Sequence, residues 1–150
     1  MSGFFYVLDE ASRILFVDDD PILREFAQVN LASPLAAIEV AADGAEAVAR
    51  LAECDYDLIL LDLEMPVMDG FAVLSRLRAD PLTQHLPVIV QTGREDVEAI
   101  DRAFRLGATS FVTKPLNWRL LSYQIRYVLR AARAERNVRA ASDGARIAAA

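Results

Sequence analysis

Apolar segments that end in acidic residues constrain the fold of this chain more than any other feature. Residues 14–17 (Ile-Leu-Phe-Val) lead directly into three consecutive aspartates, and residues 58–61 (Leu-Ile-Leu-Leu) lead into Asp62. Strands buried on both faces of a parallel sheet are continuously apolar. Carboxylates gathered at their ends repel one another unless a cation or a function accounts for them. The pattern therefore predicts buried parallel strands with an acidic edge.

The apolar segments alternate with segments of helical period, which is typical of repeated βα units around a parallel sheet. Five units fit the chain, with strands expected at residues 13–17, 37–41, 58–61, 88–91 and 110–113. The chain has 150 residues, of which 54% are hydrophobic, and this is enough for one compact core. The predicted fold is a single α/β domain.

Several aspartates have an ordinary structural explanation at helix starts. Asp20, Asp43 and Asp69 each precede a predicted helix, at the position where a carboxylate accepts hydrogen bonds from free backbone amides. Because Asp20 is assigned to this role, Asp18 and Asp19 remain as the pair that needs another explanation.

The predicted helices differ in how clearly their faces and ends are marked. The first begins at Pro21, and its apolar positions Ile22, Phe26 and Val29 lie on one side. The helix expected at residues 94–106 ends at Gly107, a position that favours a residue tolerant of positive φ.

The last predicted helix begins near Asn117 and has no stop signal until residues 142–144, so its far half is expected to project from the domain. Leu121, Ile125 and Val128 follow a spacing suited to packing, but Glu135 and Arg139 continue the same line in polar form. A full coiled coil is therefore not expected. Residues 145–150 are expected to be frayed.

Polar residues also follow two further strands: Thr92 after residues 88–91, and Lys114 after residues 110–113. In an open parallel sheet, ligands bind outside the carboxyl ends of the strands, where Asp18, Asp19 and Asp62 also fall. Paired aspartates with a third carboxylate suit Mg²⁺. Beside such a cation a carboxylate can attack phosphorus, while a lysine and a hydroxyl stabilise the transferred charge.

These motifs, in this order, closely resemble the response-regulator receiver family, the phospho-acceptor half of two-component signalling. The resemblance covers about residues 12–131 and leaves 132–150 as a helical extension and frayed tail. It is carried by four segments of the sequence, namely 14–20, 61–66 with Asp69-Gly70, 91–93 and 111–115. The match is to chemotaxis-type receivers, and the last helix resembles receivers that precede diguanylate cyclase or sensor modules.

The resemblance implies a doubly wound (βα)5 fold with sheet order 2-1-3-4-5 and a Mg²⁺-dependent site. Asp62 would accept a phosphoryl group from a sensor histidine kinase or a phosphotransfer protein. The metal would contact Asp19, Asp62 and the backbone carbonyl of Glu64, with Asp18 assisting through water. Lys114 would pair with the phosphoryl group.

The resemblance also implies a switch, in which Thr92 moves towards the phosphoryl group and Phe111 turns inward. Phe111 stands where relatives often have tyrosine, so it has no hydroxyl for partners and is expected to favour the buried state. Glu64 and Arg94 occupy positions that tune water access in this family. We expect them to pair and to set the dephosphorylation rate. The Lys114-Pro115 bond is expected to be cis.

Composition and motifs bear on other functions. The net charge of −6 and pI near 4.8 disfavour direct DNA binding, and the absence of a signal peptide or membrane span predicts a cytoplasmic location.

One alternative function is that of a pseudo-receiver that binds partners without phosphate, although no acid or lysine is missing. A haloacid-dehalogenase-like phosphatase would favour an aspartate where Glu64 stands. Beyond its own phosphorylation and dephosphorylation, the chain is not expected to be an enzyme.

The expected output is a surface made by residues 94–106, 110–113 and 117–130, the face that changes in relatives. Its expected partner is a downstream protein or an effector domain. A homodimer through this face is our hypothesis for the active state, because the last helix carries an extended apolar line.

Overall fold

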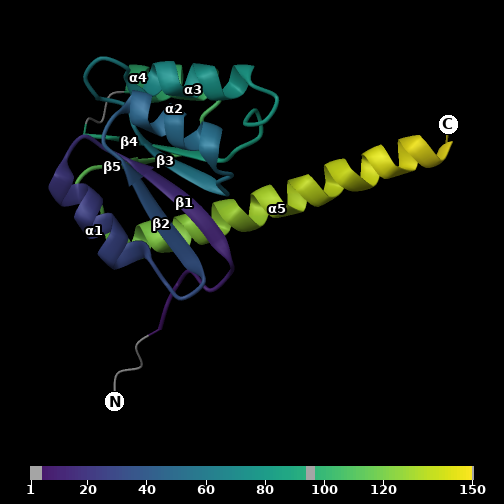
Figure 1. The fold of residues 1–150 in the computed structure, drawn as a ribbon, viewed down its shortest axis with the longest axis horizontal. Helices are drawn as coiled ribbons and strands as arrows, with labels where there is room; N and C mark the ends of the chain where they lie inside the picture. The colour runs from purple at the N-terminus through teal and green to yellow at the C-terminus, as the bar shows by residue number, and fades with distance from the viewer. Residues whose placement is uncertain (1–4, 94–96, 150) are drawn as a thin grey trace.

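The computed structural model describes residues 5–93 and 97–149, which form a five-stranded parallel sheet with helices on both faces (Figure 1). The strand order is β2-β1-β3-β4-β5, as expected. The strands are β1 (Ser12–Val17), β2 (Ala36–Ala41), β3 (Leu58–Asp62), β4 (Val88–Thr92) and β5 (Ser110–Thr113). Val17 pairs with both Ala41 and Leu61, and Asp62 pairs with Gln91, so the carboxyl ends of neighbouring strands meet at one edge.

Helices cover the two faces of the sheet unequally. They are α1 (Pro21–Leu31), α2 (Gly44–Glu53), α3 (Gly70–Ala79), α4 (Val97–Arg105) and α5 (Trp118–Ala149). One core cluster joins the sheet to α1 and α5, and the other joins it to α2, α3 and α4 (Figure 1). Between these layers β3 is fully buried and β1 is buried from Ile14 to Val17, which explains the continuous apolar sequence of these segments.

The three helix-capping aspartates lie where the sequence predicts them. Asp20 Oδ1 accepts from the amide of Ile22 at 2.9 Å, and Asp69 Oδ1 accepts from the amide of Ala72 at 2.9 Å. Asp43 accepts from the amide of Glu46 at 2.8 Å, and the Glu46 side chain accepts in return from the amide before the cap at 3.1 Å. These bonds explain why α1, α2 and α3 begin where they do.

In the sequence, Ile22, Phe26 and Val29 form an apolar line on one side of α1. In the structure this line is exposed to solvent. Ile22, Phe26 and Val29 are 60%, 49% and 74% exposed. Ala27 and Leu31 are buried against the sheet instead. Both lines have helical spacing, so the sequence pattern alone could not show which one faces the sheet.

Helix α5 continues to Ala149, past the stop expected at residues 142–144 and through the segment expected to be frayed. A single glycine costs only about 1 kcal/mol relative to alanine in a helix, and the segment that contains Ser142, Asp143 and Gly144 lies between alanine-rich stretches that favour a helix. Leu121, Ile125 and Val128 pack on the sheet as expected. The far half of the helix leaves the domain (Figure 1).

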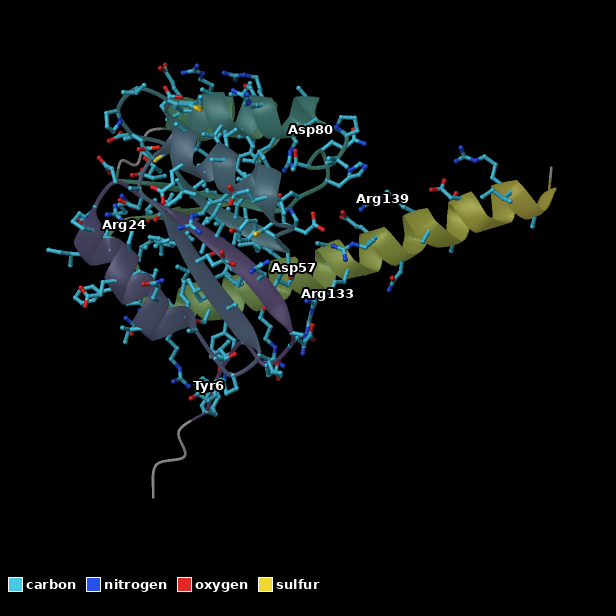
Figure 2. The ribbon with its side chains drawn as sticks, in the orientation of Figure 1. Tyr6, Arg24, Asp57, Asp80, Arg133 and Arg139 are labelled. Carbon is cyan, nitrogen blue, oxygen red and sulfur yellow. The ribbon has the colours of Figure 1, made fainter. Side chains whose placement is uncertain are left out.

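The described residues before β1, residues 5–11, form an arm along α5 that the sequence did not predict. Leu8 is buried in the core of the α1 and α5 face. Glu10 makes ion pairs with Arg130 and Arg133, and Asp9 lies 3.6 Å from Arg126. The arm is thus fastened where α5 leaves the domain, near the labelled Arg133 in Figure 2.

Helix α4 and the loops near it agree with the sequence where the structure describes them. The predicted start at Arg94 lies outside the described residues. Gly107 has positive φ (+106°), as expected, although α4 ends at Arg105, two residues before it. The Arg78 guanidinium donates to the carbonyl oxygens of Gly107, Thr83 and Leu86 and holds these loops together. In the described part of the chain, no helix is both long and apolar enough to span a membrane.

Candidate functional site

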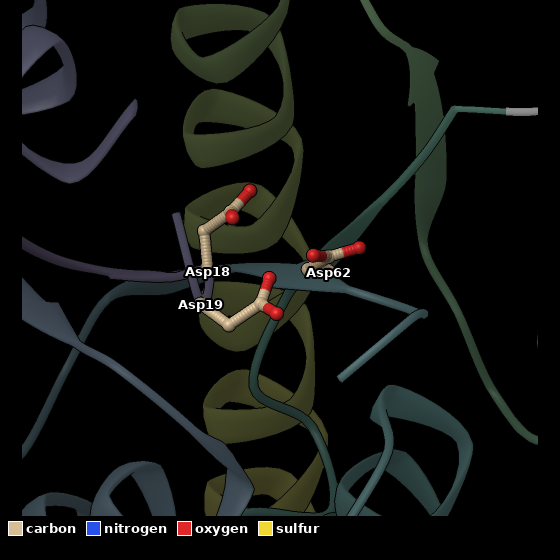
Figure 3. A group of neighbouring side chains, drawn as sticks. All are labelled: Asp18, Asp19 and Asp62. Carbon is tan, nitrogen blue, oxygen red and sulfur yellow. The ribbon is translucent and has the colours of Figure 1, made fainter. Parts of the chain in front are cut away.

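Three carboxylates meet at the carboxyl edge of the sheet, where β1 and β3 end (Figure 3). Asp18, Asp19 and Asp62 each offer an oxygen atom, and these oxygens lie within 4.8 Å of one another. The Asp18 and Asp62 side chains are buried, whereas Asp19 is exposed. The convergence follows from the parallel register, which places Val17 beside Leu61 immediately before the acids.

Hydrogen bonds hold the loop that carries Asp18. Its Oδ1 accepts from the amide of Asp20 at 2.9 Å, so the same loop that caps α1 also orients this carboxylate. The Arg24 guanidinium donates to the backbone carbonyl of Asp18 at 2.8 Å. Sequence analysis did not identify Arg24, because an arginine one turn into a helix has no distinctive spacing.

Lys114 is the cation between the two buried acids. Its Nζ lies 2.8 Å from Asp18 Oδ2 and 3.3 Å from Asp62 Oδ2. The lysine is placed by a cis peptide bond to Pro115, as expected, and by its amide, which donates to the carbonyl of Thr92 at 2.8 Å. Burial lowers the pKa of Lys114, but the hydrogen bond to Asp18 and the charges of Asp62 and Asp18 outweigh it, and the net pKa is raised.

Burial raises the pKa of Asp62 to about 6. The nearby charge of Asp18 adds to this increase, whereas the amide of Glu64, which donates to Asp62 Oδ1 at 3.1 Å, and the Lys114 ammonium oppose it. A single lysine therefore compensates two buried carboxylates incompletely.

The donor set fits a hard divalent cation. Three carboxylates face one ammonium, and all the ligand atoms offered are oxygens, which Mg²⁺ prefers. Asp18 Oδ2 is fully buried, and the Lys114 ammonium, 2.8 Å away, is the polar group that the described residues place beside it. A buried carboxylate oxygen that lies beside two other carboxylates, with one ammonium among them, is suited to a metal or to a water bound to one.

The remaining predicted site residues, Thr92 and Phe111, lie on β4 and β5. Thr92 is buried at the last position of β4. Phe111 is 41% exposed and does not occupy the buried state that we expected from the missing hydroxyl. Its ring packs edge-to-face against Phe104 of α4, with centroids 6.2 Å apart, and this contact favours the outward position.

The two residues expected to control dephosphorylation are only partly described. Glu64 is exposed beside the site, and its amide binds Asp62. Arg94 lies outside the described residues, so the proposed pair stays a prediction.

Gln91 is a further polar residue at the site that sequence analysis did not single out. Its side chain is fully buried and donates to the carbonyl of Val17, the residue before Asp18, at 3.2 Å. Its Oε1 has no hydrogen-bond partner among the described residues. The only signal in the sequence was an amide at the end of an apolar strand, and that signal does not specify a contact two strands away.

Comparisons with known proteins agree with this arrangement. Residues 14–126 match the family model of the response regulator receiver domain. The chain is 35% identical over 118 residues to the DNA-binding dual master transcriptional regulator RpaA of Synechocystis, covering 79% of this chain and 49% of that protein. It is 35% identical over 120 residues to the response regulator PleD of Caulobacter vibrioides, covering 80% and 26%.

Solved structures show the same fold. The chemotaxis protein CheY4 of Vibrio cholerae has a TM-score of 0.75 and 30% identity, covering 79% of this chain and 98% of that one. A CheY-like receiver from Methanospirillum hungatei has a TM-score of 0.78 and 28% identity, covering 84% and 99%.

An open α/β sheet with acids and a lysine at its carboxyl edge is typical of ligand-binding domains. The match to the family model identifies which family of such domains the chain belongs to. The chain belongs to the response regulator receiver domain family of two-component signalling. Receiver domains are phosphorylated by histidine kinases and regulate downstream effectors. The chain spans half or less of the length of RpaA and PleD.

Proposed function

We propose that this domain is a phosphorylation-dependent switch in which Asp62 accepts a phosphoryl group in the presence of Mg²⁺. The observation that carries the proposal is the geometry of the site. Two buried aspartates and one exposed aspartate meet within 4.8 Å, and Lys114 lies beside the two buried ones. Asp19, Asp62 and the carbonyl of Glu64 would hold Mg²⁺, with Asp18 assisting through water.

In the transfer step, a carboxylate oxygen of Asp62 forms a bond to phosphorus while the phosphorus–nitrogen bond of the donor histidine breaks. The electron pair of that bond stays on the imidazole, and Asp62 becomes an acyl phosphate. Lys114 pairs with the transferred group, and the Thr92 hydroxyl donates a hydrogen bond to it. The cation, when bound, neutralises charge on the carboxylates and on the phosphoryl oxygens. Attack by water returns phosphate and the free carboxylate.

The donor in this proposal is a sensor histidine kinase or a phosphotransfer protein. The exposed apolar line on α1, formed by Ile22, Phe26 and Val29, offers a docking surface close to the acid loop. The output face is formed by α4, β5 and α5, where Phe111 and Phe104 are both exposed. The longer relatives include a transcriptional regulator and a probable cyclic di-GMP phosphodiesterase of Vibrio cholerae. We propose that this domain likewise controls an effector outside the present sequence.

The decisive experiment measures Mg²⁺-dependent binding of beryllofluoride, a mimic of a phosphoryl group on aspartate, through the fluorescence of Trp118, the single tryptophan, which packs on Phe16. We expect binding by the wild type with Mg²⁺, and none by Asp62→Ala or after metal removal. The matched control is Asp43→Asn, which keeps the α2 cap and should bind normally. Equal signals from wild type and Asp62→Ala would reject Asp62 as the acceptor, and silence of both would favour a pseudo-receiver.

A second experiment tests the rate-controlling pair. We propose that Glu64 and Arg94 limit the access of water to the acyl phosphate. The lifetime of the phosphorylated protein should change in Glu64→Arg and in Arg94→Glu, and the double exchange should return it towards the wild-type value. Unchanged lifetimes in both single variants would reject this role.

A further inference from the structure

Helix α5 carries a second line of apolar residues that its own domain does not cover. The line follows the alternating spacing of four and three residues that is typical of coiled coils. We call it the α5 seam; its members are Tyr127, Ala131, Ala134, Val138, Ala141 and Ala145. All six are exposed, and Tyr127 and Val138 are 75% and 68% exposed. Leu120, one heptad before Tyr127, continues the line and is 65% exposed.

The seam is distinct from the line that anchors α5 to the sheet. Leu121, Ile125 and Val128 are buried, and at 100° per residue they lie about 100° or more around the helix from the seam. The buried line becomes polar at Glu135 because no sheet remains beside it there. The seam instead stays apolar as far as Ala145 and is exposed along its whole length.

Charge is also distributed as a helix pair requires. The segment from Tyr127 to Ala145 contains six charged residues, and none of them lies on the seam: Arg130, Arg133, Glu135, Arg136, Arg139 and Asp143. In a parallel pair of helices, the residue just before every second core position, here Ala131, faces the residue five positions later in sequence on the partner helix. Here those positions are Arg130 and Glu135, which carry opposite charges.

The projecting half of α5 would also gain stability from a partner. Every side chain from residue 140 to residue 148 is exposed, so this part of the helix packs against none of the residues that the structure describes. Isolated helices of this length are marginal in water, and most helical stability in proteins comes from packing an apolar face. A helix with an unpacked apolar face and no intramolecular neighbour is therefore stabilised best by a matching helix.

We propose that two copies of this chain associate through the α5 seam as a parallel, two-fold symmetric helix pair. The occupant is a second copy because the seam is self-complementary and because Arg130 of one copy meets Glu135 of the other. Arg130 already contacts Glu10 of its own chain at 3.3 Å, but a guanidinium has five N–H donors and can serve both acids. This association uses neither α4 nor β5, and it does not depend on phosphorylation at Asp62.

Small residues dominate the seam, and this sets the expected strength of the pair. Alanine allows the helices to approach closely but buries little apolar surface. The dimer is therefore weak and reversible, and its population depends on protein concentration. Such an equilibrium can be shifted by an additional contact elsewhere in the molecule.

The first test compares two neighbouring alanines on opposite sides of α5, in the full unphosphorylated chain. Ala141→Glu places a charge on the seam, whereas Ala140→Glu makes the same chemical change on the outer face. In sedimentation equilibrium, the wild type and Ala140→Glu should show a mass that rises towards a dimer with concentration. Ala141→Glu should weaken the dimer by about tenfold or more. A monomeric wild type, or equal weakening by both variants, would overturn the proposal.

Disulfide trapping then tests the parallel register. In a Cys54→Ser background, which removes the single native cysteine, Val138→Cys should form a disulfide-linked dimer under mild oxidation, and Ala140→Cys should not. Arg130→Glu and Glu135→Arg should each weaken association, and the double exchange should restore it. If the single exchanges strengthen the dimer, like charges face each other in the wild type. That result would mean an antiparallel pair and would refute the parallel arrangement.

Discussion

The buried carboxylate of Asp62 makes the stability of the metal-free protein depend on pH. Its folded pKa of about 6 exceeds the ordinary value of 3.8, so between these values the folded protein retains a proton that the unfolded chain has lost. The contribution of this proton is fully present below about pH 4 and disappears as pH rises through about 6. Ionised Asp62 therefore destabilises the fold at neutral pH, in the absence of Mg²⁺.

Replacing Asp62 by asparagine should remove this penalty. We expect Asp62→Asn to raise the free energy of unfolding at pH 7 by about 2 kcal/mol, and the gain should vanish below about pH 4. Urea denaturation in EDTA measures both values. Asp69→Asn, which changes a capping acid near the surface, should show no such pH-dependent gain. A gain for Asp62→Asn that is equal at both pH values would contradict the assignment.

Lys114 stabilises the folded metal-free protein, whereas the ionised carboxylate of Asp62 destabilises it. Lys114→Met leaves Asp18 and Asp62 buried without a cation, and this should destabilise the metal-free protein by about 3 kcal/mol. Added Mg²⁺ should recover more stability in this variant than in the wild type, because metal binds only the folded site. Thermal denaturation with and without Mg²⁺ measures the difference, with exposed Arg76→Met as the control. A loss that Mg²⁺ leaves unchanged would argue against a shared electrostatic site.

At the scale of elements, the contact between α4 and β5 holds the aromatic ring of the predicted switch in its outward position. An edge-to-face pair such as Phe104–Phe111 contributes about 0.5–1.5 kcal/mol. If the phosphorylated state needs Phe111 inward, Phe104→Ala should increase beryllofluoride affinity by up to about tenfold. Val97→Ala, an exposed change on the same helix, is the control. Lower affinity in Phe104→Ala would mean that the outward ring belongs to the activated state.

The elements differ in how far the sequence could determine them. The strands and the capped helix starts were predictable because each depends on local signals, such as a continuous apolar run or an aspartate at the cap. The buried side of α1 was not predictable, because Ile22, Phe26 and Val29 form a helical line as regular as the line of residues that packs on the sheet. The end of α5 was not predictable from Gly144, because the cost of one glycine in a helix is small and the alanine-rich stretches on both sides of residues 142–144 favour a helix.

The site was predictable at the scale of the whole molecule for a topological reason. Parallel strands end at one edge, so acids, a hydroxyl and a lysine that follow different strands must converge there. The contacts of Gln91 with Val17 and of Glu10 with Arg133 could not be anticipated in the same way. They join residues that are far apart in the sequence, and their partners are set by packing rather than by any local pattern.

The arm before β1 provides a prediction at this largest scale. Removal of Glu10 should loosen α5, because this residue pairs with both Arg130 and Arg133. In Glu10→Ala, amide hydrogen exchange over about residues 128–136 should accelerate several-fold. High salt should reduce the difference from the wild type, since the pairs are partly exposed. Glu53→Ala, an exposed acid on α2, should leave exchange in α5 unchanged, and an equal change there would exclude a specific role for the arm.

The projecting half of α5 can also be considered mechanically, as a lever whose fulcrum is the cluster of ion pairs between the arm and the helix. Residues 133–149 continue about 25 Å beyond this point, at 1.5 Å per residue. A tilt of about 10° at the fulcrum would move the tip by about 4 Å, although the domain itself would hardly change. A small tilt at the fulcrum would thus be amplified into a displacement of the helix tip that a neighbouring module could detect.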